Sequence, residues 1–135
     1  MQDAKLAGPT CPPTLLISDD DQLLVSALTR YFRSQGVQVI ADLNSNVVEL
    51  ARAHQPALII LDIAQSVDGR DLLAQLKRDL KTKHIDVFVV TANRDSFTRA
   101  ICFQLGARGY FIKPTNHSFI RRVNDYLALG ARQLH

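Results

Sequence analysis

The segment Pro56-Ala-Leu-Ile-Ile-Leu-Asp62-Ile-Ala-Gln-Ser-Val-Asp-Gly69 decides the fold of this chain. Residues 57–61 are all apolar, which is typical of a central strand in a parallel sheet covered by helices on both faces. The strand ends at a carboxylate, Asp62, and a turn-like segment then leads to Gly69. In open parallel α/β sheets, ligands bind in the crevice outside the carboxyl ends of the strands. Asp62 therefore lies where a functional site is expected, although an Asp in this place can also do no more than cap the next loop.

The composition is that of one globular domain. The chain has 135 residues, of which 47% are hydrophobic and 21% charged, and its net charge of +3 is not gathered into a basic, aromatic-rich surface for nucleic acid. No apolar run approaches the ~20 residues of a membrane span, and residues 1–13 lack the apolar centre of a secretory signal. We expect a flexible tail over 1–13 and one domain over 14–135. With only Cys11 and Cys102, a disulfide framework is not expected, which favours a cytoplasmic location.

Strands and helices alternate from Thr14 onward, without an internal repeat. Short apolar segments predict strands over 14–18, 37–41, 57–61, 85–90 and 109–112. The intervening segments have helical spacing of apolar residues. Five β-α units within about 120 residues predict a doubly wound five-stranded parallel sheet with helices on both faces.

Each helix has signals for its inner face or its ends. The first helix is expected to follow Asp21 and to stop at Gly36, with Leu24, Ala27, Leu28 and Tyr31 at helical spacing. The second is expected to begin at Asn44 or Ser45 and the fourth at Asp95 or Ser96, while the third carries a stripe of Leu72, Leu73, Leu76 and Leu80. The fifth is expected to begin at Thr115 or Asn116, with Phe119, Ile120, Val123, Tyr126 and Leu127 facing inward.

Polar residues follow four of the predicted strands at their carboxyl ends. They are Asp19 and Asp20 after the first strand, Asp62 after the third, Thr91 at the end of the fourth and Lys113 after the fifth. Each has an ordinary explanation when taken alone, as a helix cap, a strand end or a solvated lysine. Together they share one edge of a doubly wound sheet, so we expect them to form one pocket.

The charges of this pocket favour a divalent cation. Three carboxylates carry a formal charge of −3, and at ~4 Å and an effective dielectric constant near 20 each like-charge pair costs about 4 kcal/mol. A divalent cation together with Lys113 balances them. Ligation by oxygen alone favours Mg²⁺ over Zn²⁺, which prefers His or Cys.

The same residues suit the transfer of a phosphoryl group. Asp62 would be the nucleophile and would form an acyl phosphate. The metal ion and Lys113 would neutralise the phosphoryl oxygens, and the Thr91 hydroxyl would donate to one of them.

These motifs resemble the receiver domain of two-component response regulators. The resemblance rests on the acidic pair after the first strand, Ile60-Leu61-Asp62, Thr91-Ala92 and the segment Gly106-Ala-Arg-Gly-Tyr-Phe-Ile-Lys-Pro114, and it covers about residues 14–129. It implies a flavodoxin-like strand order of 2-1-3-4-5. It also implies a signalling switch, and not a turnover enzyme, that a sensor histidine kinase, a phosphotransfer protein or a small phosphodonor phosphorylates on Asp62.

The resemblance further implies a role for each site residue. Asp20 would bind Mg²⁺ directly and Asp19 through water, with Asp62 and the backbone carbonyl of Ala64 completing the metal site. Thr91 and Lys113 would contact the phosphoryl group. Tyr110 would be the aromatic residue that rotates inward on activation, and the Lys113–Pro114 bond is expected to be cis.

The loop after Asp62 departs from the family pattern. Residues 63–69 lack the usual Pro and are one residue shorter, so the path of this loop decides how the metal is held. A degenerate receiver, which binds partners without being phosphorylated, is therefore the alternative. An aspartyl phosphohydrolase is disfavoured because Ala64 stands where its second Asp would be, and a nucleotide-binding fold because the chain has neither G-x-G-x-x-G nor a P-loop after a strand.

The expected output surface is the face made by the fourth helix, the fifth strand and the fifth helix. Phe103, Arg121, Arg122 and Tyr126 are candidates to line it, with partial core packing as the competing explanation. A downstream protein, or a second copy of the chain, would bind there after phosphorylation. No direct contact with nucleic acid or membrane is expected.

Overall fold

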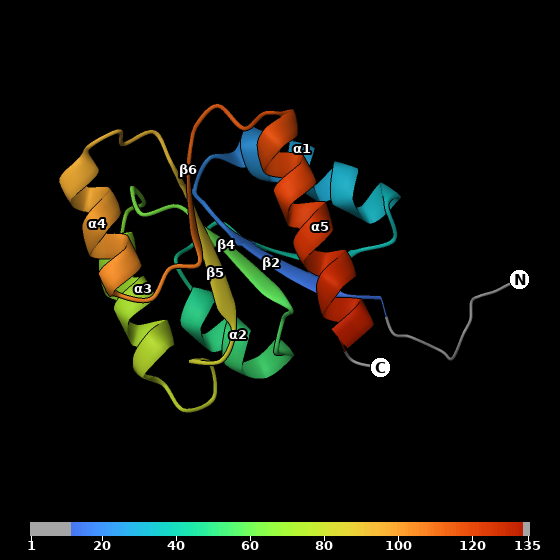
Figure 1. The fold of residues 1–135 in the computed structure, drawn as a ribbon, viewed down its shortest axis with the longest axis horizontal. Helices are drawn as coiled ribbons and strands as arrows, with labels where there is room; N and C mark the ends of the chain where they lie inside the picture. The colour runs from blue at the N-terminus through green and yellow to red at the C-terminus, as the bar shows by residue number, and fades with distance from the viewer. Residues whose placement is uncertain (1–11, 134–135) are drawn as a thin grey trace, which may run out of the picture.

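The computed structural model describes residues 12–133, with side chains to residue 128, and contains one five-stranded sheet. The elements are β2 (Thr14–Ser18), α1 (Gln22–Ser34), β3 (Gln38–Asp42), α2 (Val47–His54), β4 (Leu58–Leu61), α3 (Gly69–Arg78), β5 (Asp86–Thr91), α4 (Ser96–Gln104), β6 (Gly109–Ile112) and α5 (His117–Gln133) (Figure 1). All strand pairs are parallel, in the order β3-β2-β4-β5-β6. This is the predicted order 2-1-3-4-5, so the predicted fold class is confirmed.

The predicted division into a tail and a domain is not settled by the described residues. Residues 1–11 of the predicted tail lie outside them, and the division stays a prediction. None of the helices in the described part of the chain is long and apolar enough to cross a membrane.

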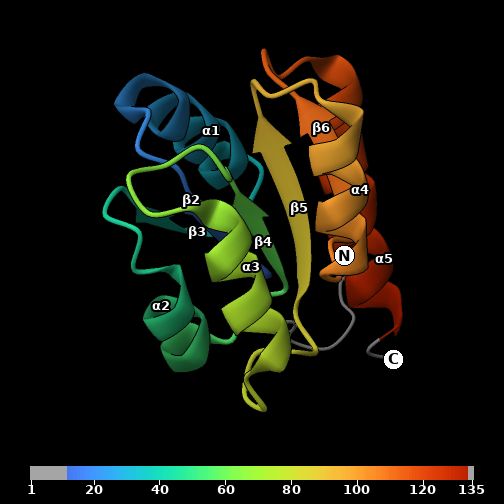
Figure 2. The ribbon, with the colours of Figure 1, turned by 90° about the vertical axis from the view of Figure 1, so that its left-hand side faces the viewer.

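Alternate strand residues point to opposite sides of the sheet. Because both sets are apolar in the central strand β4, helices cover both faces. On one face, Ile59 and Leu61 of β4 pack with α2, α3 and the buried Cys102 of α4. On the other, Leu58 and Ile60 pack with α1 and α5. Figure 2 shows α2, α3 and α4 on the near side of the strands, with α1 and α5 behind them. β4 is therefore buried on both faces, as its unbroken apolar sequence predicts.

The buried face of α1 differs from the predicted one. The residues that pack inward are Val25, Leu28 and Phe32, whereas Ala27 and Tyr31 are exposed. Phe32 offers a fully apolar ring, while the Tyr31 hydroxyl accepts a surface hydrogen bond from Asn124 at 3.1 Å. The helix is therefore rotated by about one residue from the predicted orientation.

The buried leucine stripe of α3 is one leucine shorter than predicted. Leu72, Leu73 and Leu76 are buried, but Leu80 is 79% exposed. The helix stops because Asp79 takes an extended backbone conformation and its carboxylate accepts a hydrogen bond from the Lys81 amide at 2.8 Å. Leu80 follows this helix end and lies outside the stripe, so the prediction for Leu80 was wrong.

The predicted helix starts are correct at α4 and α5 and wrong at α2. Asp95 caps α4, and the Asn116 side chain accepts from the Phe119 amide at 3.1 Å in the first turn of α5. The N-cap of α2 is Asn46, and its side chain makes no capping bond. Ser45 instead has a left-handed backbone (φ 58°) and directs its hydroxyl toward Gln65. The sequence pattern did not anticipate that contact.

Leu73 and Leu80 provide a matched test of the core. Leu73→Ala should lower the free energy of unfolding by about 2–5 kcal/mol, because the side chain is fully buried and leaves a cavity. Leu80→Ala should change it by less than about 0.5 kcal/mol, as expected of an exposed position. Urea titration of both variants measures the difference, and equal losses would contradict the described end of α3.

Candidate functional site

The polar residues predicted at the strand ends lie at one edge of the sheet. The parallel registers place Ser18 beside both Asp42 and Leu61, and Thr91 beside Ile112. The residues that directly follow these strands therefore meet. Asp19, Asp20 and Asp62 each direct one carboxylate oxygen to a common point, with all three oxygens within 4.8 Å of one another. The predicted acidic cluster is present.

Lys113, which follows the edge strand β6, contacts two of these carboxylates. Its Nζ lies 2.8 Å from Asp19 Oδ2 and 2.9 Å from Asp62 Oδ2. Both carboxylates are 3% exposed, so the ammonium lies between two buried negative charges. The Lys113–Pro114 peptide that precedes α5 is cis, as the family resemblance implied.

The second oxygen of each buried carboxylate is also held. Asp19 Oδ1 accepts from the Asp21 amide, and Asp62 Oδ1 accepts from the Ala64 amide, both at 2.9 Å. These backbone bonds fix the rotamers of the two acids. Asp21 itself caps α1 by accepting from the Leu24 amide, and so only Asp19 and Asp20 of the three consecutive acids belong to the pocket.

Burial and neighbouring charges shift the pKa values of Asp19 and Lys113. Burial raises the pKa of Asp19, and the Asp62 charge adds to this, while Lys113 opposes both. Burial alone would lower the pKa of Lys113, but the two carboxylates outweigh it and raise that pKa above its ordinary value. The lysine therefore stays charged, and it shares its charge between two acids. The pKa of Asp19 is raised although an ammonium touches it, because the effect of burial, with that of the Asp62 charge, exceeds the lowering by Lys113 and by the Asp21 amide.

Thr91 and Tyr110 meet at the backbone of Asn93. The buried Thr91 Oγ1 accepts from the Asn93 amide at 3.2 Å, and the Tyr110 hydroxyl donates to the Asn93 carbonyl at 2.9 Å. The Tyr110 ring is half-buried against the core cluster of α3 and α4, and burial raises the pKa of its phenol. Thr91 keeps its own hydroxyl proton available for another acceptor.

Gln65 is a site residue that the sequence pattern missed. Its Nε2 donates to Asp62 O at 2.8 Å, to Ser18 O at 3.0 Å and to Ser18 Oγ at 3.1 Å. Glutamine in a loop carries no periodic signal, and its contacts depend on the path of the shortened loop. The departure from the family pattern at residues 63–69 was the only signal in the sequence that pointed to this segment.

An open cavity of about 460 Å³ lies beside the acidic cluster. It is bounded by the loop after β4 and the segment after β5, through Ile63, Ala64, Gln65, Ser66, Asp68, Arg70, Asn93 and Thr98. The Arg70 guanidinium at its rim pairs with Asp68 at 3.0 Å. Its lining includes Ile63 and Ala64, the two residues that follow Asp62, but none of the three carboxylates.

Some candidate residues of the output surface are exposed, and others pack against neighbouring side chains. Phe103 is 38% exposed, with the Arg99 guanidinium over its ring, and Arg121 is exposed. The Arg122 guanidinium lies over the Phe88 and Phe111 rings. Tyr126 is half-buried and donates to Asp86 Oδ2 at 2.6 Å. The competing explanation, core packing, thus holds for Tyr126.

The donor set fits the predicted Mg²⁺. Three carboxylates and one ammonium leave a net charge of −2 in the pocket, and every side-chain donor is a hard oxygen, as Mg²⁺ prefers. The structure thus defines a doubly wound parallel α/β domain with a pocket of hard oxygen donors at the carboxyl edge of its sheet.

The chain belongs to the response regulator receiver domain family, whose pattern matches residues 15–124. It is 30% identical over 119 residues to the polar-differentiation response regulator DivK of Brucella anthropi, covering 86% of this chain and 97% of that protein. It is 27% identical to the transcriptional regulatory protein AfsQ1 of Streptomyces coelicolor, but spans only 54% of it. A crystal structure of a response regulator from Chloroflexus aurantiacus superposes with a TM-score of 0.77 at 28% identity, over 87% of this chain and 98% of that one.

Proposed function

We propose that this domain is a phosphorylation switch that accepts a phosphoryl group on Asp62 in a Mg²⁺-dependent reaction. The donor would be a sensor histidine kinase, a phosphotransfer protein or a small phosphodonor. The observation that carries the proposal is the position of Asp62, which is buried, 2.9 Å from Lys113 and within the cluster of three carboxylates. Membership of the receiver family supports it.

In the proposed step, an Asp62 carboxylate oxygen attacks the phosphorus of the donor. A new O–P bond forms while the P–N bond of a phosphohistidine, or the P–O bond of an acyl phosphate, breaks. The electron pair of the broken bond leaves with the imidazole or the carboxylate of the donor. The products are an aspartyl phosphate on this chain and the unphosphorylated donor.

The residues around Asp62 would stabilise the charge on the transferred group. Asp19, Asp20, Asp62 and the Ala64 carbonyl would hold Mg²⁺, which supplies the positive charge that neutralises the phosphoryl oxygens. Lys113 would move its ammonium from the Asp62 oxygen to a phosphoryl oxygen. The Thr91 hydroxyl would donate to another oxygen, and the Asn93 backbone would carry that change to Tyr110.

The output would pass through the face of α4, β6 and α5. Phe103 and Arg121 are the candidates there that are exposed and do not pack against the core. The downstream partner, homodimerisation and the cytoplasmic location stay predictions.

Mass spectrometry of the intact protein tests the proposal. Incubation with acetyl phosphate and Mg²⁺ should add one phosphoryl group to the wild type and none to Asp62→Asn, because the amide is not a nucleophile of this kind. Asp71→Asn is a matched control, since Asp71 is exposed on α3 away from the carboxylate cluster, and it should be phosphorylated like the wild type. A wild type that gains no mass, with the donor and metal verified on another receiver domain, would support the degenerate receiver instead.

A further inference from the structure

We propose that Gln65 is the positioning residue of the metal-side loop: its carboxamide fixes the path of residues 63–68 and thereby the carbonyl of Ala64. This inference rests on the proposed function, because it names the residue that makes the shortened loop competent to hold Mg²⁺. It concerns a residue that touches neither the reacting carboxylate oxygens nor the lysine.

The carboxamide connects three separate segments of the chain. Its nitrogen donates to the backbone at the ends of β2 and β4, through Ser18 O and Asp62 O, and also to the Ser18 hydroxyl. Its oxygen accepts from the hydroxyl of Ser45, in the loop between β3 and α2, at 3.1 Å. A side chain bonded to three segments is held in one position, and the backbone that carries it is held as well.

The direction of each hydrogen bond agrees with the chemistry of its partners. The Ser18 hydroxyl donates its proton to Asp42 Oδ2 at 2.9 Å, so its lone pairs are free to accept from Gln65. Asp42 is 3% exposed, and its other carboxylate oxygen, Oδ1, accepts from the Asn44 amide at 3.0 Å, so both oxygens of this buried carboxylate have a partner. Exchanging the carboxamide oxygen and nitrogen would place an acceptor against two carbonyl oxygens. The network thus defines one orientation of Gln65.

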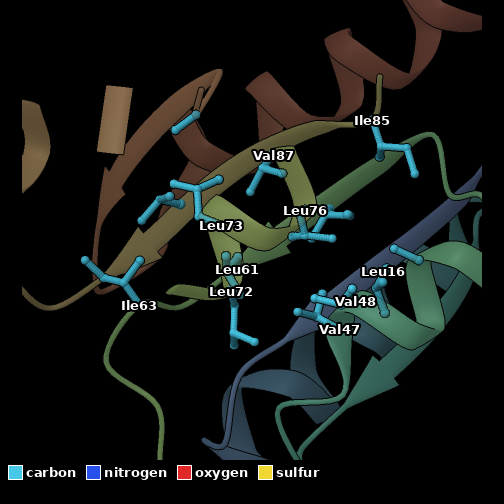
Figure 3. Close-up of a cluster of buried hydrophobic side chains, with 14 of the residues drawn as sticks. Leu16, Val47, Val48, Leu61, Ile63, Leu72, Leu73, Leu76, Ile85 and Val87 are labelled. Atoms are coloured by element: carbon cyan, nitrogen blue, oxygen red, sulfur yellow. The ribbon is translucent and has the colours of Figure 1, made fainter. Parts of the chain in front are cut away.

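The rest of the loop depends on the same anchor. On its apolar side, Ile63 is buried at the edge of the core cluster, beyond Leu61, as Figure 3 shows. The Gly69 amide donates to Ile63 O at 2.9 Å, and Ala64 pairs with Asp68 in an isolated bridge. Between these contacts, Ser66 and Val67 are exposed. Gln65 therefore supplies the side-chain hydrogen bonds that tie this loop to β2 and to the loop after β3, while Ile63 ties it to the core.

Ala64 is held on both sides. Its amide donates to Asp62 Oδ1 at 2.9 Å, and the next residue is fixed by the Gln65 carboxamide. The carbonyl of Ala64 belongs to the peptide group that joins these two residues. Its direction is consequently set by the phosphoacceptor carboxylate on one side and by Gln65 on the other.

The test compares Gln65→Met, which keeps the length of the side chain but removes its polar atoms, with Ser66→Ala in the exposed part of the same loop. Amide hydrogen exchange, followed by NMR without metal, should accelerate by roughly 10-fold or more at Ala64 and Gly69 in Gln65→Met only. Mg²⁺ affinity, measured by titration calorimetry, should fall about 10-fold in Gln65→Met and stay unchanged in Ser66→Ala. Ser45→Ala removes only the acceptor contact and should give a smaller change of the same sign.

A kinetic measurement separates positioning from general loosening of the fold. With acetyl phosphate, Gln65→Met should require more Mg²⁺ for half-maximal phosphorylation and reach a rate within about 2-fold of the wild type at saturation, because the reacting groups are unchanged. Unchanged exchange at Ala64 and Gly69 would overturn the proposal. So would faster exchange with unchanged Mg²⁺ affinity. A wild type that is not phosphorylated would instead refute the proposed function, while the exchange comparison would still decide the role of Gln65.

Discussion

Lys113→Met should lower the free energy of unfolding of the metal-free protein by about 3 kcal/mol or more at neutral pH. The substitution leaves Asp19 and Asp62, each 3% exposed, facing one another without the ammonium that now touches both. A buried charge that loses its partner costs more than the pair contributed, because the two carboxylates are far less hydrated in the folded protein than in the unfolded chain. Urea titration of the variant and the wild type measures the loss.

The pH dependence of this loss has a defined sign. The pKa of Asp19 is already raised by burial, and removing the lysine raises it further. The folded variant therefore binds a proton more tightly than the unfolded chain does. Its deficit relative to the wild type should shrink as the pH falls through the folded pKa of Asp19.

Mg²⁺ should also restore the stability of Lys113→Met, since it supplies positive charge to the same carboxylates. Lys83→Met is the matched control, because the Lys83 side chain is exposed, and it should change stability by less than about 0.5 kcal/mol. Equal stability of Lys113→Met and the wild type at neutral pH would contradict the described ion pairs.

Gly69→Ala should destabilise the protein by about 3 kcal/mol and weaken Mg²⁺ binding at the same time. A Cβ at this position would lie 2.2 Å from Ile63 Cα and 2.7 Å from Asp62 O. Both are backbone atoms of the phosphoacceptor segment, so they cannot give way as a flexible side chain would. The first turn of α3 must move away from the loop, and the loop must move relative to the carboxylates.

Gly36→Ala separates this clash from the general cost of replacing glycine. Gly36 has a φ of +85° and no atom near the position of an added Cβ, so its substitution should cost about 1–2 kcal/mol of backbone strain and leave Mg²⁺ affinity unchanged. Thermal unfolding and calorimetric titration of both variants distinguish the two effects. A Gly69→Ala variant with unchanged Mg²⁺ affinity would show that the contact with Ile63 does not govern the metal site.

The strand ends of this protein could be predicted from sequence, because parallel topology turns separate segments into neighbours. Asp62, Thr91 and Lys113 follow strands with clear apolar patterns, and the sheet then brings them to one edge whatever the details of the helices. The fold class followed from the same alternation of strands and helices. Predicting the pocket required only the residue types at the strand ends, and no distances between them.

Other features depended on information that periodicity does not contain. The inner face of α1 is shifted by one residue because Phe32 and Tyr31 are adjacent and only packing distinguishes them. Leu80 leaves the core because Asp79 ends the helix through a local side-chain bond. Gln65 gains its role from the path of the loop, which brings its carboxamide to atoms 47 residues away in sequence. Such contacts arise from tertiary geometry and leave no repeating signal.

The two hydrogen bonds at Asn93 have a consequence for how this domain can vary in evolution. Thr91 and Tyr110 are joined through main-chain atoms, since the threonine accepts from the amide of Asn93 and the tyrosine donates to its carbonyl. Every residue type except proline offers both atoms. The proposed link between the threonine and the tyrosine therefore uses only main-chain atoms of position 93. The side chain of Asn93 has a separate contact, because its Oδ1 accepts from the amide of Asp95, the N-cap of α4, at 2.8 Å. Variation at position 93 is therefore limited by the turn before α4 and not by the two main-chain bonds.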